Sequence, residues 1–101
     1  MKVNFYSSAD FFDEGANLRI LKASFLDCPM HYHDFVEFAY VHSGSAIHII
    51  DGKSYEIRKG DLFIMNTNTP HEIAPSERQD GNFVVINCIF KPEFIDGALM
   101  D

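Results

Sequence analysis

The chain has 101 residues, enough for one small domain with one modest apolar core. Apolar residues make up 47% and aromatic residues 14%, a composition that excludes intrinsic disorder and favours strands through its ten phenylalanines. The formal net charge is −7 and the basic residues are scattered, so we expect the chain by itself to bind neither nucleic acid nor an anionic membrane surface.

The first segment of the chain, residues 1–16, has no strong periodicity and no signal-peptide pattern. We expect it to form an arm that can cover the mouth of the domain, with a permanently paired edge strand as the alternative. Its candidate ligand contacts are Phe5, Tyr6, Phe11 and Phe12. The chain has only two cysteines and no apolar run near the ~18 residues of a membrane helix, which predicts a cytoplasmic location.

Short strands separated by turn residues follow the arm. The apolar runs predict strands over residues 17–26, 35–42, 46–50, 54–58, 62–65, 71–74 and 82–90. Asp51 and Gly52 are a strong signal for a two-residue hairpin turn. Residues 91–101 turn away from the last strand, with Pro92 near the start of a candidate helix. The pattern predicts an all-β fold, a small barrel or jelly roll.

Two histidines and a glutamate share one parity near the middle of the chain. Residues two apart in an extended strand point to the same side, so His31, His33 and Glu37 should project together toward the core. A core-facing glutamate costs free energy unless it is paired or coordinated. Imidazole and carboxylate groups suit Zn, Ni, Fe or Mn, so one strand would supply part of the shell of one divalent metal ion. His71, from a separate short strand, is the candidate for a fourth ligand.

The same residues also suit a polar pocket without a metal, because imidazole and carboxylate groups hydrogen-bond the hydroxyl groups of sugars. Two further histidines are poorer ligand candidates. His42 has the opposite parity to Glu37 and should point outward. His48 lies in the middle of a hairpin without acidic neighbours, so we expect it to be a surface or packing residue.

An apolar stripe lies opposite Glu37 and consists of Val36, Phe38 and Tyr40. We expect this stripe to form a second layer of core against the N-terminal segment. The alternative is a dimer face, because a contiguous exposed apolar patch marks an interaction site.

The spacing of these residues resembles the two sequence motifs of cupin proteins. The first motif, G-x5-H-x-H-x3–4-E-x6-G, is met at His31, His33, Glu37 and Gly44, and Phe25 stands in place of its leading glycine. The second motif, G-x5-P-x-G-x2-H-x3-N, is met at Gly60 and His71, while its other positions hold Asn66, Asn68 and Pro75. The resemblance implies a small cupin barrel, the double-stranded β-helix or jelly roll, with all four ligand positions filled.

A longer stretch, roughly residues 18–94, resembles the N-terminal cupin of AraC-family transcription regulators. The positions that fit the pattern of that family after the hairpin are Tyr55, Ile57, Gly60, Asp61, Leu62, Ile64 and His71. The resemblance implies that residues 1–101 are a single domain that binds a small effector, often a carbohydrate, and forms a homodimer. It also implies that DNA is bound only by a separate C-terminal helix-turn-helix domain, which this chain does not contain.

Two functions follow from these observations. The first is the ligand-sensing and dimerisation domain of an AraC-type regulator, which responds to a sugar or another small metabolite and has no catalytic residues. The alternative is a stand-alone metal-dependent cupin enzyme of the dioxygenase or isomerase type, in which the same four ligands leave positions open for substrate. No nucleophile beside a base and no phosphate-binding glycine loop stands out in the sequence.

Overall fold

The computed structural model describes residues 3–24, 28–78 and 81–94. In chain order its elements are β1 (Asn4–Tyr6), α1 (Ser8–Phe11), β2 (Leu18–Ser24), β3 (Cys28–His33), β4 (Val36–Ser43), β5 (Ser45–Ile50), β6 (Lys53–Arg58), β7 (Leu62–Met65), β8 (His71–Pro75) and β9 (Val84–Phe90). The prediction of an all-β fold is therefore confirmed. Within the described ranges, no helix has the length and apolar character needed to cross a membrane.

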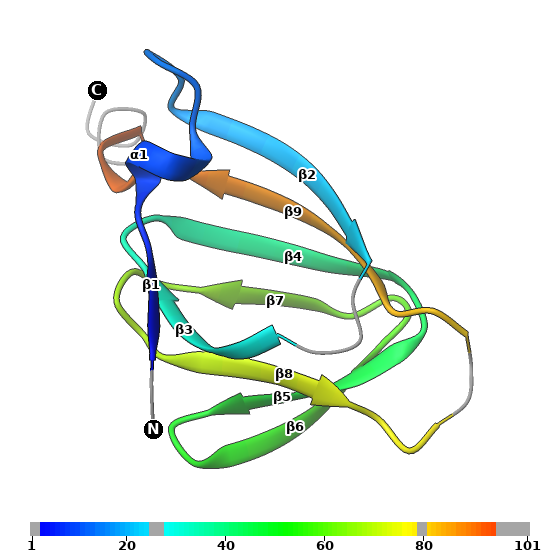
Figure 1. The fold of residues 1–101 in the computed structure, drawn as a ribbon. Helices are drawn as coiled ribbons and strands as arrows, with labels where there is room; N and C mark the ends of the chain where they lie inside the picture. Colours follow the sequence, from blue (N-terminus) through cyan, green and yellow to red (C-terminus); the bar gives the residue numbers. More distant parts are fainter. Residues whose placement is uncertain (1–2, 25–27, 79–80, 95–101) are drawn as a thin grey trace.

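The strands form two sheets that lie against each other (Figure 1). A five-stranded sheet has the order β1-β3-β8-β5-β6, and a four-stranded sheet has the order β2-β9-β4-β7. Buried side chains from both sheets pack between them, among them Val41 of β4, Ile73 of β8 and Val85 of β9. Because side chains alternate along a strand, the buried residues of a strand lie two apart, as Ala39 and Val41 do in β4.

The β5–β6 hairpin follows its predicted turn. Asp51 and Gly52 have φ of 52° and 74°, and Ile50 pairs with Lys53 across the turn. Two consecutive positive φ values match the twist of the flanking strands, which explains the choice of an aspartate followed by a glycine. A tighter constraint applies at Gly44, between β4 and β5, where φ is 74° and a Cβ atom would lie 2.5 Å from the carbonyl oxygen of Asn82.

The chain changes sheet between the two histidines and the glutamate singled out above. β3 ends at His33 in the five-stranded sheet, the chain bends at Asp34 and Phe35, and β4 begins in the four-stranded sheet. The prediction that one strand carries His31, His33 and Glu37 is therefore wrong. The bend is held in place because the carboxylate of Asp34 accepts a hydrogen bond from the backbone N–H of Ser8, at 2.7 Å.

The N-terminal segment is more regular than its sequence predicted. β1 pairs in parallel with β3, so the segment forms an edge of the five-stranded sheet. Ser7 then caps the single turn of α1, its side-chain oxygen accepting from the backbone N–H of Ala9 at 3.1 Å. We refer to residues 3–16 as the arm.

The arm does not cover the apolar stripe of β4. Val36 is buried, but Phe38 and Tyr40 are 37% and 43% exposed on the outer face of the four-stranded sheet. The expectation that the N-terminal segment packs on this stripe is wrong, because pairing with β3 places the arm on the other sheet.

The ends of two predicted elements lie outside the described residues. These are the last two residues of the strand predicted over 17–26 and most of the helix predicted within 91–101. Residues 92–94 are helical, as the position of Pro92 predicted.

Candidate functional site

A cavity of about 120 Å³ lies between the two sheets, next to the point where the chain crosses from β3 to β4. Its polar lining consists of His31, His33, Glu37, His71 and Asn87. Most of its remaining wall is apolar and includes Leu21, Ile73 and Ile89. The volume accommodates about four water molecules and is below the roughly 300–1,000 Å³ of pockets that enclose drug-sized ligands.

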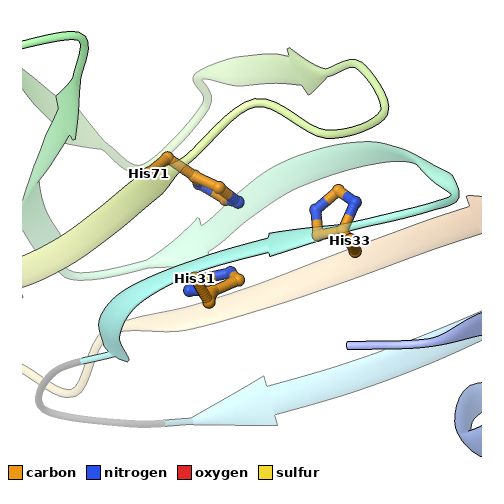
Figure 2. A group of neighbouring side chains, drawn as sticks. All are labelled: His31, His33 and His71. Carbon is orange, nitrogen blue, oxygen red and sulfur yellow. The ribbon is translucent and has the colours of Figure 1, made fainter. Parts of the chain in front are cut away.

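Three histidine side chains from two strands meet at this cavity (Figure 2). β3 supplies His31 and His33, and β8 supplies His71. One nitrogen from each ring lies within 4.8 Å of the other two, so small movements of the rings would allow all three to bind a single metal ion. All three side chains are almost completely buried.

Backbone carbonyl groups fix the tautomers of the two histidines on β3. Nδ1 of His31 lies 2.8 Å from the carbonyl oxygen of Pro29, and Nδ1 of His33 lies 2.7 Å from that of Phe35. A carbonyl oxygen only accepts, so each Nδ1 must carry the donated hydrogen. Each neutral ring then has its lone pair on Nε2, the form that binds metal ions.

His71 has one nitrogen paired and the other without a partner. Its Nδ1 lies 2.9 Å from Nε2 of His48, a contact within hydrogen-bond range. Its Nε2 is buried and makes no hydrogen bond to any residue that the structure describes. An unpaired buried polar atom costs about 1–3 kcal/mol, so this nitrogen is free to bind a hydrogen-bonding group or a cation.

Glu37 contacts one member of the histidine group. Its Oε1 lies 3.2 Å from Nε2 of His33, and its side chain is 12% exposed. The Nδ1–H of His33 is already donated, so a neutral His33 faces the carboxylate with a lone pair. Two acceptors at this distance require a shared proton or a cation between them. The three imidazoles form a group that fits a divalent metal ion, and Glu37 lies next to this group through its contact with His33.

Burial favours the uncharged form of His31, His48 and His71. Desolvation, followed by the nearby rings of His31, His48 and His33, lowers the pKa of His71 to about 2. Burial also lowers the pKa of His31 and of His48, although the carboxylate of Glu37 opposes the shift at both. Neutral imidazole is the form needed both for metal binding and for accepting a hydrogen bond from a ligand.

We expect the metal-free protein to lose stability in mild acid. The unfolded chain protonates His71 near its ordinary pKa of 6.5, whereas the folded protein resists protonation down to about 2. The free energy of unfolding therefore falls as the pH drops below 6.5, by about 1.4 kcal/mol per pH unit from His71 alone. Denaturant titrations between pH 7.5 and 5, in the presence of a chelator, measure the slope. An unchanged slope in His71→Gln would contradict this assignment.

Comparison with known families identifies the chain. The profile of the AraC-like ligand binding domain matches residues 24–101, more than half of the chain. The chain belongs to this family. The transcriptional activator RhaR of Escherichia coli K12 is 33% identical to this AraC-like domain over 63 residues, which are 62% of the chain and 21% of RhaR. The domain thus spans about a fifth of the length of the curated relatives that it matches.

Solved structures share the fold of this AraC-like domain. An RmlC-like cupin from Shewanella frigidimarina has a TM-score of 0.63 at 20% identity and covers 77% of this chain and 71% of its own. An HTH_3 family transcriptional regulator from Vibrio cholerae has a TM-score of 0.63 at 20% identity, over 79% of this chain and 46% of its own. Such distant likeness establishes the fold alone, and it confirms the prediction of a small cupin barrel.

The arm of the AraC-like domain supplies part of the cavity wall. Tyr6 and Phe11 line the cavity, and the ring of Tyr6 stacks on His31 at a centroid distance of 4.9 Å. Phe12 is buried beside the cavity against Phe35, with centroids 5.7 Å apart. Phe5 lies elsewhere: it is 48% exposed and packs on Tyr32.

Two polar residues of this region were not recognised from the sequence. His48 is only 2% exposed, so the expectation of a surface position is wrong and packing in the interior is correct. Its even parity, shared with the buried Ala46 of β5, was the available signal. Asn87 points inward between Val85 and Ile89, and its Oδ1 is buried without a partner in the part of the chain that the structure describes. A single amide on the inner face of an apolar strand was the signal there. His42 is exposed, as its parity predicted.

Proposed function

We propose that this AraC-like domain is the effector-sensing and dimerisation part of an AraC-type transcription regulator, and that it binds a sugar or another small metabolite in the cavity between its sheets. The observation that carries the proposal is the combination of unpaired polar atoms and arm residues around one cavity. Nε2 of His71 and Oδ1 of Asn87 are buried without partners among residues 3–24, 28–78 and 81–94, and both residues line a space that Tyr6 and Phe11 help to close. A hydroxylated ligand supplies the missing hydrogen bonds.

We also propose that the cavity holds one divalent metal ion, Zn, Ni, Fe or Mn. Its ligands would be Nε2 of His31, His33 and His71 together with the carboxylate of Glu37. A bound ion would polarise an oxygen atom of the effector and orient it. The protein's own contribution is to hold three buried imidazole rings around one cavity and to fix the tautomers of His31 and His33.

The arm is the element that would report on the ligand. The cavity of about 120 Å³ is small for a sugar ring, so a sugar has to change the positions of the arm side chains that close it. The arm is held by pairing of β1 with β3, by the bond from Ser8 to Asp34 and by the stacking of Tyr6 on His31. A ligand that contacts the arm differently in its docked and released states shifts the balance between those states.

Hydrogen exchange tests this mechanism. A thermal-shift screen of pentoses and hexoses identifies a ligand, and exchange in residues 1–16 is then measured with and without it. We expect the amide protection of the arm to change on binding, with β6, which supplies no residue to the cavity lining, as internal reference. A sugar that binds in the cavity and leaves arm protection unaltered would refute the arm mechanism.

The proposed partners are a second copy of the chain and, through a separate C-terminal helix-turn-helix domain, DNA in the cytoplasm. The outer face of the four-stranded sheet supports dimer formation, because it exposes the apolar side chains of Ile20, Phe38, Tyr40, Leu62 and Ile64. Sedimentation of the purified chain measures the oligomeric state.

A metal-dependent cupin enzyme is the second candidate function, and the histidine group is the observation that favours it. An imidazole and carboxylate donor set with open coordination positions also supports catalysis. The two candidates differ in the fate of the ligand. A regulator returns its effector unchanged after prolonged incubation with metal-loaded protein, whereas an enzyme converts it, which chromatography of the small molecule detects.

A further inference from the structure

His48 lies directly behind His71 as seen from the cavity. It is 2% exposed, it does not line the cavity, and its Nε2 is 2.9 Å from Nδ1 of His71. The ring of Phe63 packs against His48 with centroids 4.6 Å apart. The position of His48 is set by the β5–β8 ladder, in which it pairs with Ile73. The contact between the two rings is therefore built from rigid strands.

One hydrogen atom between these rings decides what His71 presents to the cavity. If Nε2–H of His48 donates to Nδ1, a neutral His71 carries its hydrogen on Nε2 and shows a donor to the cavity. If Nδ1–H of His71 donates to Nε2 of His48, the lone pair of His71 is on Nε2 and faces the cavity. Only the second arrangement allows His71 to bind a cation.

His31 and His33 do not have this choice. The carbonyl groups of Pro29 and Phe35 only accept, so they hold both rings with the hydrogen on Nδ1. At His71 the corresponding place is taken by an imidazole, which accepts in one tautomer and donates in the other. The structure thus puts His48 where the other two histidines have a backbone carbonyl group.

We propose that His48 is a positioning residue for the metal site: it accepts Nδ1–H of His71 and so holds the Nε2 lone pair of His71 on the bound cation. This inference rests on the proposed function, because it assumes that the histidine group binds a divalent ion. It adds a residue that does not touch the ion and fixes both the orientation and the tautomer of one that does. Such outer partners typically change metal affinity about 10- to 100-fold.

Two substitutions at His48 separate its hydrogen-bonding role from its packing role. In His48→Phe the ring is retained and the acceptor is lost, so we expect Zn²⁺ affinity, measured by competition with a chromophoric chelator, to fall about 10- to 100-fold. His48→Gln places an amide oxygen near the former Nε2, so we expect it to restore most of the affinity. His42→Phe, the same substitution at an exposed histidine, is the control and should match the wild type.

A spectroscopic measurement on the wild-type chain needs no variant. With ¹⁵N-labelled histidine and bound Zn²⁺, long-range ¹H–¹⁵N correlation spectra should show His71 protonated on Nδ1 and ligated through Nε2. Ligation through Nδ1 would overturn the inference even if His48→Phe failed to fold. Wild-type Zn²⁺ affinity in a folded His48→Phe would overturn the role of His48 alone. Absence of Zn²⁺ binding by the wild-type chain would instead overturn the metal site, and the inference with it.

Discussion

Replacing His33 with alanine is expected to lower the affinity of the chain for Zn²⁺ by more than about 100-fold, beyond the effect of losing an outer partner. His33 is 1% exposed, its Nδ1–H is committed to Phe35, and its Nε2 faces both the cavity and Glu37. The substitution removes Nε2 of His33, a metal-ligand atom whose orientation is fixed by the bond to Phe35, and it leaves the carboxylate of Glu37 without its imidazole partner. The measurement is a competition titration with a chromophoric chelator at neutral pH.

The matched control is His42→Ala, which removes the same side chain from an exposed position on β4. Its Zn²⁺ affinity should equal that of the wild type. Far-UV circular dichroism and thermal unfolding with a chelator present verify that both variants are folded. If His33→Ala and His42→Ala bound Zn²⁺ equally well, the histidine group between the sheets would not be the metal site.

Among glycine-to-alanine substitutions at the glycines that the structure describes, Gly44→Ala is expected to cause the largest loss of stability. The residue has a φ of 74°, and the added Cβ would lie 2.5 Å from the carbonyl oxygen and 2.7 Å from the carbonyl carbon of Asn82. These are backbone atoms and cannot rotate away. We expect the free energy of unfolding to fall by about 3 kcal/mol or more, from backbone strain and overpacking together.

Gly52 provides the control for this experiment, because it has the same φ of 74° but no heavy atom within 4 Å of an added Cβ. Gly52→Ala therefore adds only the conformational strain, about 1–2 kcal/mol. The difference in the free energy of unfolding between the two variants, measured by urea denaturation, gives the cost of the contact between the added Cβ at Gly44 and the backbone of Asn82. Equal losses of stability would show that the chain relaxes around Gly44 and that the contact does not constrain the fold.

The sequence predicted those features that depend on local alternation and on turn chemistry. The inward positions of Ala39 and Val41 follow from the period of two along β4, and the hairpin follows from Asp51 and Gly52. The meeting of His31 and His33 with His71 was expected from the resemblance to the cupin motifs, since spacing alone does not bring two distant strands together.

Features that depend on pairing between distant segments were not predicted. Odd or even residue number predicts the direction of a side chain only within one continuous strand. It therefore gave no indication that the chain changes sheet at Asp34 and Phe35. Glu37 still points inward after the bend, because β3 and β4 lie in different sheets and the inner faces of both sheets border the same core. The parallel pairing of β1 with β3 is likewise a long-range contact with no local signature. The buried position of His48 depends on the pairing of β5 with β8, which turns this side of β5 toward the interior.

The bond between Ser8 and Asp34 has a consequence for the thermodynamics of the domain. Asp34 follows His33 directly in the chain, so the anchor of the arm and a lining residue of the cavity are consecutive residues. Coupling between two equilibria is reciprocal: the factor by which a docked arm alters the affinity for an effector equals the factor by which the effector alters docking of the arm. Docking of the arm on the barrel is an intramolecular binding step, so the arm acts as a tethered ligand with a high effective concentration. On the proposed function, a substitution at Ser8, which anchors the arm but does not line the cavity, would therefore shift the concentration of effector to which the domain responds.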